Sequence, residues 1–134
     1  MTTTMTTFLA DSSIWIDHLR RSSSLLLRVM DGDDAAHTEP VAMEVLSGAR
    51  DRTQFDRLQR MLLGTPLVQF DSAADFGAAT ELRRSALHDS LRVGIVDCMI
   101  IAVAGRTQVP LLTRDRGQAQ LARLHGITTT LLTD

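Results

Sequence analysis

The amino-acid sequence predicts a three-layer α/β/α domain with a central, mainly parallel sheet. Short apolar runs of strand length alternate with longer amphipathic segments along the chain, which is the pattern of strand–helix–strand units. Strands joined through helices run parallel to one another. With 134 residues, no internal repeat and no linker, the chain is expected to form one domain, residues 1–134.

Apolar runs and helix-start signals predict the elements of the first half of the chain. The hydroxyl pair Ser12 and Ser13 opens the first helix, and an acidic turn with a glycine, residues 31–34, ends the second. Residues 38–40 start the third helix with an N-cap hydroxyl, an acid in the first turn and an early proline. In order, we expect strand 7–10, helix 12–19, helix 25–30, strand 35–37, helix 38–48, helix 55–63 and strand 66–70.

The second half of the chain contains the most apolar segment, residues 93–105. A segment that is apolar on every helical face indicates a buried helix, and thirteen residues are too few for a membrane span, which needs about 20. Gly126 is expected to end the last helix. In order, we expect helix 73–87, helix 93–105, strand 109–113, a helix through Leu121 and Leu124, and strand 127–132.

Asp97 is the acid within this buried helix. A carboxylate buried without a partner would cost several kcal/mol or take up a proton. The nearest arginines, Arg92 and Arg106, flank the apolar run and do not face it, and the chain has no lysine. A divalent metal ion shared with other carboxylates is therefore the sharpest explanation of Asp97.

Three further acids are placed where such a site would form. Asp11 and Asp115 follow two of the expected strands, and the carboxyl ends of parallel strands meet at one edge of a sheet. Glu44 borders the apolar stripe of its helix. Carboxylate oxygens suit Mg²⁺ or Mn²⁺, and four crowded carboxylates raise one another's pKa unless a cation joins them.

Each of these acids also has a simpler interpretation. Asp11 can be a helix-capping acid, and Asp115 a cap or a surface ion pair. Glu44 can be paired with an arginine such as Arg92, because buried acids are usually paired. The four acids together are more specific than any one of them.

Composition narrows the function classes. A single cysteine excludes an internal disulfide and a cysteine-based zinc cluster, and it fits a reducing compartment. No secretion signal is visible, so we expect a cytoplasmic protein. All 14 basic residues are arginine, which excludes P-loop and Schiff-base chemistry. The net charge of −2 does not indicate nucleic-acid binding. The four histidines are expected at the surface or at its boundary with the core.

Over nearly its whole length the chain resembles the PIN-domain ribonucleases, and in particular the VapC-type toxins of toxin–antitoxin pairs, and four stretches of its sequence carry the resemblance. Their order and spacing both agree with the family. The stretches are residues 9–17, 39–49, 96–102 and 111–116. The resemblance implies a PIN-like fold whose metal-binding acids are Asp11, Glu44, Asp97 and Asp115, with hydroxyl groups at Ser13 and Thr113.

The resemblance implies a Mg²⁺- or Mn²⁺-dependent endoribonuclease in which a metal-activated water cleaves RNA. Arg92, Arg114 and Arg116 are candidates for holding RNA phosphates. The implied partners are a cognate antitoxin and a second toxin chain in a homodimer. Trp15, the sole tryptophan, is either a core residue or part of a groove for the partner.

One position departs from the family, because many relatives carry a further acid where this chain has Gly117. The second metal position is therefore expected to be weak, unless a positive φ is what requires glycine there.

The sequence leaves two other function classes open. A phosphatase with an Asp11 nucleophile lacks the usual second aspartate at Ser13 and a lysine. A catalytically weak PIN-fold binding module would act mainly through its protein partner.

Overall fold

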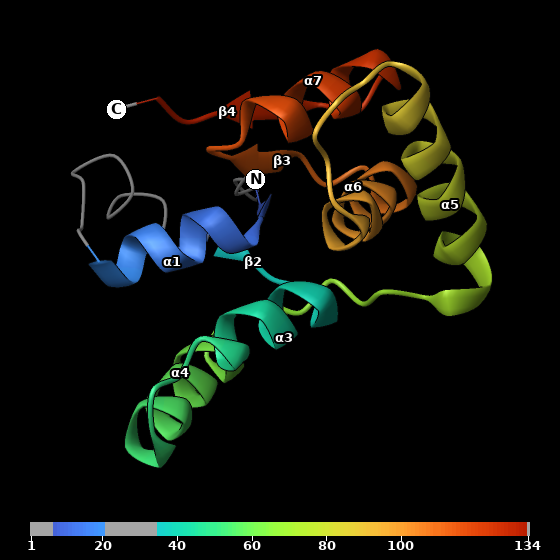
Figure 1. Ribbon diagram of the computed structural model, residues 1–134. Coiled ribbons are helices and arrows are strands. Elements are labelled where there is room, and N and C mark those ends of the chain that lie inside the picture. Colours follow the sequence, from blue (N-terminus) through green and yellow to red (C-terminus); the bar gives the residue numbers. More distant parts are fainter. Residues whose placement is uncertain (1–6, 21–34, 134) are drawn as a thin grey trace, which may run out of the picture.

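The computed structural model describes residues 7–20 and 35–133. Within these residues a four-stranded parallel sheet forms the centre of the molecule (Figure 1). The central strand β1 pairs with β2 on one side and with β3 on the other, so that Leu9 lies opposite both Ala36 and Leu111. The strands, in the spatial order β2-β1-β3-β4, are β1 (Phe8–Ala10), β2 (Ala35–Ala36), β3 (Leu111–Thr113) and β4 (Thr129–Leu131). The predicted parallel α/β architecture is confirmed.

Helices surround this short sheet. Two of them, α5 and α6, pack along each other over much of their length, and α7 contacts both. On the other side of the molecule α1 packs on α3, and α4 packs on α3 in turn. The described helices are α1 (Ser12–Arg20), α3 (Glu39–Ser47), α4 (Arg52–Leu63), α5 (Ser72–His88), α6 (Ile95–Thr107) and α7 (Arg116–Leu124). The expected helix 25–30 and the turn 31–34 lie outside the described residues.

Helix ends follow the sequence signals in part, and the helix expected over residues 93–105 runs over Ile95–Thr107 instead. Thr38 is the N-cap of α3, as predicted, but its hydroxyl makes no capping hydrogen bond. The helix predicted from residue 55 starts earlier, because the Asp51 carboxylate accepts a hydrogen bond from Gln54 N at 2.8 Å. Gly126 directly follows the C-cap of α7 with φ of +73°, a conformation that glycine adopts without strain.

The predicted strand 66–70 is wrong. This segment contributes a single parallel bridge, between Leu67 and His37, with hydrogen bonds from His37 N to Pro66 O at 3.0 Å and from Val68 N to His37 O at 2.8 Å. The physical reason lies in its neighbour, since Thr38 already begins the turn into α3. The chain beyond β2 therefore offers one residue for pairing, and the ladder stops there.

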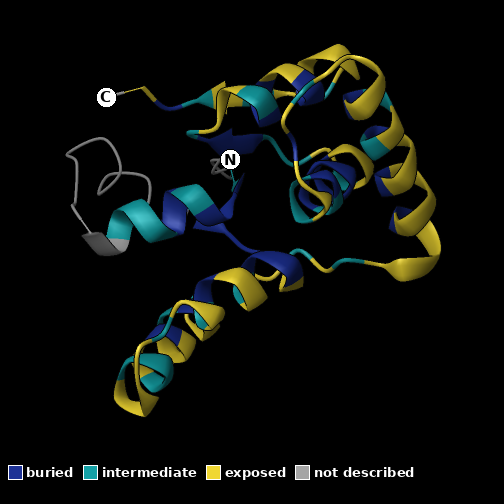
Figure 2. Ribbon diagram, viewed as in Figure 1, coloured by how far each residue is buried: buried dark blue, intermediate teal, exposed yellow. Residues whose placement is uncertain are grey.

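The core lies between the sheet and the inner faces of the helices (Figure 2). The strands β1 and β3 are buried almost throughout, and α6 is the most buried helix, as its apolar sequence predicts. By contrast, α4 and α5 expose their outer faces. Among the described residues, no helix combines the length and the apolar character that crossing a membrane requires.

Candidate active site

The sheet topology brings the predicted acids to one edge. Asp11 directly follows β1 and Asp115 follows β3 after one intervening residue, and these strands are parallel neighbours. Asp11 N donates a hydrogen bond to Leu112 O at 3.0 Å, which fixes the end of β1 against β3. Asp97 lies in the first turn of α6 and Glu44 on α3, and these two helices contact each other.

Asp11 is the most buried of the four acids, with 2% of its surface exposed. Its Oδ1 accepts hydrogen bonds from Ser13 Oγ at 2.5 Å and from Ile14 N at 3.2 Å, and its Oδ2 accepts one from Thr113 Oγ1 at 2.6 Å. Burial raises the pKa of Asp11 and the Asp115 carboxylate adds to that rise, while these three hydrogen bonds oppose it. The two hydroxyl residues expected beside the site therefore contact Asp11 directly.

Asp97 reports the electrostatic state of the whole group. Its pKa is raised from 3.8 to about 6, first by burial and then by the negative charges of Asp11, Asp115 and Glu44. All three other acids are thus close enough to disfavour ionisation of Asp97. We call Asp11, Glu44, Asp97 and Asp115 the acidic cluster.

The simpler interpretations hold in part for two members of the acidic cluster. Asp11 precedes α1 and accepts from Ile14 N, while Asp115 is the N-cap of α7 and its Oδ1 accepts from Gln118 N at 2.9 Å. In both residues the capping oxygen is Oδ1, which leaves Oδ2 for other contacts. Capping and membership of the acidic cluster therefore coexist in the same side chain.

Glu44 is held by a hydroxyl group. Ser12 Oγ donates a hydrogen bond to Glu44 Oε1 across the contact between α1 and α3. Within residues 7–20 and 35–133, Glu44 has no ion pair with an arginine, so the alternative pairing with Arg92 is not seen there. Glu44 lies at the exposed rim of the acidic cluster.

The acids are gathered but do not converge on one point. In the part of the chain that the structure describes, no three Asp, Glu, His or Cys side chains are placed to hold a metal ion. Instead, hydroxyl groups occupy oxygens of Asp11 and Glu44. Closing a metal site therefore requires these carboxylates to come closer together by rotation about their side-chain bonds, and a metal-bound carboxylate can keep its hydroxyl partner.

Gln118 is a site residue that sequence reasoning missed. Its side chain is fully buried, its Oε1 accepts from Thr113 Oγ1 at 2.9 Å, and its Nε2 donates to the carbonyl oxygen of Asp97 at 3.5 Å. Gln118 thus links β3 to the first turn of α6. The Asp115–Gln118 spacing is that of a capping box, so the pattern could have placed Gln118 in the first turn of α7, but it does not reveal the burial of its amide.

The three arginine candidates are in different environments. Arg114 forms an ion pair with Asp17, with Nε and Oδ2 2.8 Å apart, and its side chain is 15% exposed. The structure therefore places Arg114 in a structural contact and not on an accessible phosphate-binding surface. Arg92 and Arg116 are exposed.

Trp15 is a core residue, so the structure contradicts an exposed position for it. Its side chain is 1% exposed, and its Nε1 donates to Ala10 O at 3.1 Å. The ring stands edge-on to His37, which is also buried, contrary to the expectation for the histidines. Because the indole is buried in these contacts, it cannot anchor a partner protein.

Gly117 is closely packed against the backbone of Arg92. It lies in the first turn of α7, and Gly126 is the glycine with positive φ among the described residues. A β-carbon at Gly117 would lie 3.0 Å from the carbonyl oxygen of Arg92 and 3.3 Å from Asp115 Oδ1. The positive-φ explanation is wrong, and a further acid at this position would first have to displace the Arg92 backbone.

Comparisons with known proteins agree with this architecture. The PIN domain family matches residues 8–124, which include all four acids. VapC ribonuclease Mb1587 of Mycobacterium bovis and ribonuclease VapC11 of Mycobacterium tuberculosis are each 35% identical over 123 residues, covering 87% of this chain and 92% of the relative. The chain belongs to the PIN-domain family.

Solved structures share the PIN fold at lower identity. VapBC2 from Rickettsia felis, bound to a DNA fragment from its promoter, has a TM-score of 0.74 at 15% identity and covers 94% of this chain and 98% of that one. DNA-bound VapBC from Salmonella typhimurium has a TM-score of 0.74 at 17% identity with the same coverage. FitAcB from Neisseria gonorrhoeae has a TM-score of 0.68 at 17% identity, covering 91% and 95%. At these identities the likeness concerns the fold alone.

Proposed function

We propose that this PIN domain is a Mg²⁺- or Mn²⁺-dependent endoribonuclease and the toxin of a toxin–antitoxin pair. The observation that carries the proposal is the gathering of four carboxylates at one edge of the sheet, at the ends of β1 and β3 and on the contacting helices α3 and α6, where three of them raise the pKa of Asp97. Such a concentration of charge is costly unless a cation binds there. The 35% identity to two VapC ribonucleases supports RNA as the substrate.

The donor set fits the proposed metal. Four carboxylates supply hard oxygen ligands, which Mg²⁺ and Mn²⁺ prefer, and the buried Cys98 thiol belongs to the core. Asp11, Glu44, Asp97 and Asp115 would hold the ion after rotation about their side-chain bonds. Because many relatives carry a further acid where this chain has Gly117, Asp115 is the carboxylate expected at the second metal position. We therefore expect one well-occupied metal position beside Asp11 and Asp97, and occupation of the second position only with RNA bound.

The chain's own residues would prepare the reaction. A bound ion would supply an activated water and neutralise charge on the phosphate in the transition state. Ser13 and Thr113 fix the orientation of Asp11 through its two oxygens. At the exposed rim, Arg92 and Arg116 would pair with RNA phosphates, which position the strand but do not read its sequence.

The proposal includes a cognate antitoxin and a homodimer. Its support is the similarity to VapC ribonucleases and to chains in VapBC and FitAcB structures. An antitoxin segment that covers the acidic cluster would suppress cleavage. Since Trp15 is buried, the contact surface must be formed by other residues than the one first considered.

A metal-dependent cleavage assay with a matched pair of variants tests the enzymatic proposal. The chain is incubated with a mixed RNA pool, with and without Mg²⁺ or Mn²⁺, as the natural sequence, as Asp97→Asn and as Asp56→Asn. Asp56 is a partly exposed acid of a surface ion pair on α4, so Asp56→Asn removes one charge from a helix that carries none of the four acids.

We expect cleavage that requires the metal, is unchanged in Asp56→Asn and falls in Asp97→Asn by more than the about 10- to 100-fold typical of residues behind a metal ligand. Equal cleavage by both variants would refute the proposal. A folded chain that binds its antitoxin but cleaves no RNA would instead favour the binding module.

A further inference from the structure

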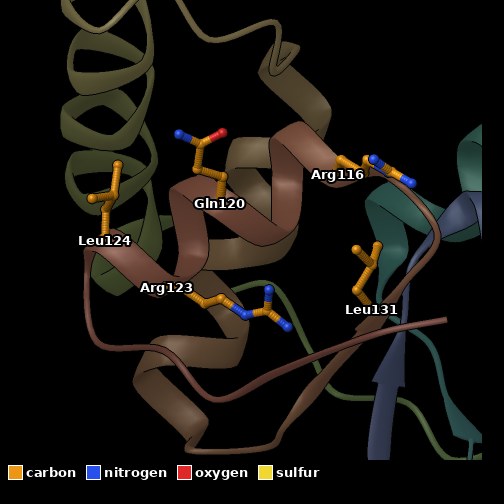
Figure 3. A pocket seen from close by; sticks show the side chains of 5 residues that line it. All are labelled: Arg116, Gln120, Arg123, Leu124 and Leu131. Carbon is orange, nitrogen blue, oxygen red and sulfur yellow. The ribbon is translucent and has the colours of Figure 1, made fainter. Parts of the chain in front are cut away.

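A hollow of about 430 Å³ lies on the outer side of α7, where that helix packs against β4. Figure 3 shows the side chains that line it. Four come from α7, namely Arg116, Gln120, Arg123 and Leu124, and Leu131 comes from β4. The volume is within the range of small-ligand sites, about 300–1,000 Å³. None of the five lining residues is acidic.

The two arginines give the hollow a positive character. Arg116 and Arg123 are both exposed, and within residues 7–20 and 35–133 neither has an ion pair with an acid. They are seven residues apart on one helix, so their Cα atoms are about 10 Å apart along its axis. Arg123 Nη2 donates to Thr129 O at 3.3 Å, which partly fixes the guanidinium beside β4. Two nearby phosphates of one extended strand can reach two such groups.

The remaining lining residues suit a base. Leu124 is 59% exposed and Leu131 is partly exposed, which leaves aliphatic surface open beside the arginines. The exposed amide of Gln120 can both donate and accept a hydrogen bond, as base edges in single-stranded RNA require. A site for inorganic phosphate alone would need neither the leucines nor the amide.

The hollow is continuous in the chain with the acidic cluster. Arg116 directly follows Asp115, so the hollow starts at the N-terminus of α7. Leu131 is paired with Thr113 in the β3–β4 ladder, and Thr113 donates its hydroxyl hydrogen bond to Asp11. A strand whose scissile phosphate lies at the acids therefore has this hollow beside it, along α7 and β4.

We propose that this hollow is a subsite for a nucleotide flanking the cleaved bond, with phosphates on Arg116 and Arg123 and a base against Leu124, Leu131 and Gln120. The inference rests on the proposed ribonuclease function and adds the path of the substrate. It also separates substrate grip from chemistry, because Arg123 is away from the acidic cluster. Guanidinium groups suit this task because one guanidinium can bind two oxygens of the same phosphate in a bidentate contact.

The test uses steady-state cleavage of RNA oligonucleotides that share one cleaved sequence and are extended stepwise on either side of it. The natural chain is compared with Arg123→Gln, with Arg123→Lys, and with Arg60→Gln as the matched control. Arg60 is also an exposed arginine in the last turn of its helix, but on α4. Melting curves confirm that each variant is folded.

The natural chain should show a KM that falls as the RNA is extended on one side. Arg123→Gln should lose most of this gain, with KM raised about 3- to 10-fold on the long RNA, kcat unchanged, and no effect on the shortest RNA. The slope of log KM against log salt should fall by about 0.7, which is the change expected when a protein neutralises one phosphate fewer on a single strand. Arg123→Lys should retain most of the slope, and Arg60→Gln all of it.

The outcomes separate this inference from the function on which it rests. If the natural chain cleaves RNA but Arg123→Gln matches Arg60→Gln in KM and salt slope, the subsite is refuted and the ribonuclease proposal stands. The same holds if Arg123→Gln weakens only binding of the antitoxin, since the hollow is then a protein-binding surface. If the natural chain cleaves no RNA with either metal, the proposed function fails and the subsite with it.

Discussion

A single buried hydroxyl organises the acidic cluster at the scale of residues. Thr113 Oγ1 has one hydrogen, which it shares between Asp11 Oδ2 at 2.6 Å and Gln118 Oε1 at 2.9 Å, and the same oxygen accepts from Asp115 N at 3.0 Å. Its side chain is fully buried, so none of these partners can be replaced by bulk water without opening the sheet edge. One oxygen atom therefore contacts both Asp11 and Asp115.

Thr113→Val removes this oxygen and keeps the shape of the side chain. Loss of a donor to a buried carboxylate leaves Asp11 less well solvated, and we expect the free energy of unfolding to fall by about 1–3 kcal/mol. The pKa of Asp11 should rise further, because the Thr113 hydrogen bond opposes the effect of burial. Denaturant unfolding measures the first effect, and a carboxyl NMR titration measures the second.

Thr80→Val is the control for this change. Thr80 is exposed on α5 and its hydroxyl donates to Phe76 O at 2.9 Å within the helix, so its loss should cost less than about 0.5 kcal/mol. If the two variants have equal stability, Thr113 does not have the organising role described here.

Asp97 makes the stability of the metal-free chain depend on pH. Its pKa in the folded chain is about 6, above the value of 3.8 for an unfolded chain. A raised acid pKa means that the folded state binds the proton more tightly, so the contribution of this group is full below about pH 4 and is lost as pH rises through 6. Removing the charge should therefore stabilise the chain at neutral pH and not at pH 4.

We expect Asp97→Asn in EDTA to melt higher than the natural chain at pH 7.5 by an amount that corresponds to about 1–2 kcal/mol, once solvent screening is allowed for. The difference should shrink towards zero between pH 6 and pH 4. Thermal melting at several pH values measures it. A difference that is the same at pH 4 and pH 7.5 would show that ionisation of Asp97 does not destabilise the folded chain.

At the level of secondary-structure elements, an ion pair with a buried carboxylate joins α5 and α6, the two helices that pack along each other. Asp75 of α5 is fully buried, and its carboxylate accepts from Arg106 of α6, with Nε–Oδ1 at 2.7 Å and Nη2–Oδ2 at 3.0 Å. Arg106 Nη2 also donates to Gln69 O at 2.7 Å, which ties down the segment before α5. This contact holds the end of α6 opposite to Asp97.

Arg106→Gln leaves the Asp75 carboxylate buried without its cation. Breaking a fully buried pair costs about 3–5 kcal/mol, and since the Arg106 side chain is 36% exposed we expect a smaller loss of stability than that, but a larger one than in the control. The control is Arg84→Gln, which breaks the exposed pair with Glu81 and should cost at most about 1 kcal/mol. Urea unfolding of both variants gives the comparison, and equal midpoints would contradict the stabilising role of the Asp75–Arg106 pair.

Much of the fold at the scale of the whole molecule could be predicted from sequence, because strong periodicities determine it. The apolar residues of β1, β3 and α6 can be buried in one way, and parallel strands then bring Asp11 and Asp115 to the same edge. Local pattern failed where a partner decided the outcome. Residues 66–70 look like a strand, but β2 is too short to pair with them.

The same reason explains the errors within the site. A tryptophan beside an acid can be a core or a surface residue, and only the packing around His37 and Ala10 places Trp15 inside. Arg114 is available by its sequence position, but Asp17 lies beside it in the fold. Gln118 carries no local signal of burial, since its contacts come from β3 and α6. Contacts between residues far apart in the sequence cannot be inferred from local sequence patterns.

The most direct test of the central claim is a crystal structure of this chain grown with saturating Mn²⁺, with the ion located by anomalous scattering. We expect one strong manganese peak bounded by the carboxylates of Asp11 and Asp97, with Glu44 turned from Ser12 towards it, and no such peak in Asp97→Asn. A map without a peak among the four acids, or with its strongest peak elsewhere on the surface, would contradict the claim that these carboxylates form a metal-binding catalytic centre.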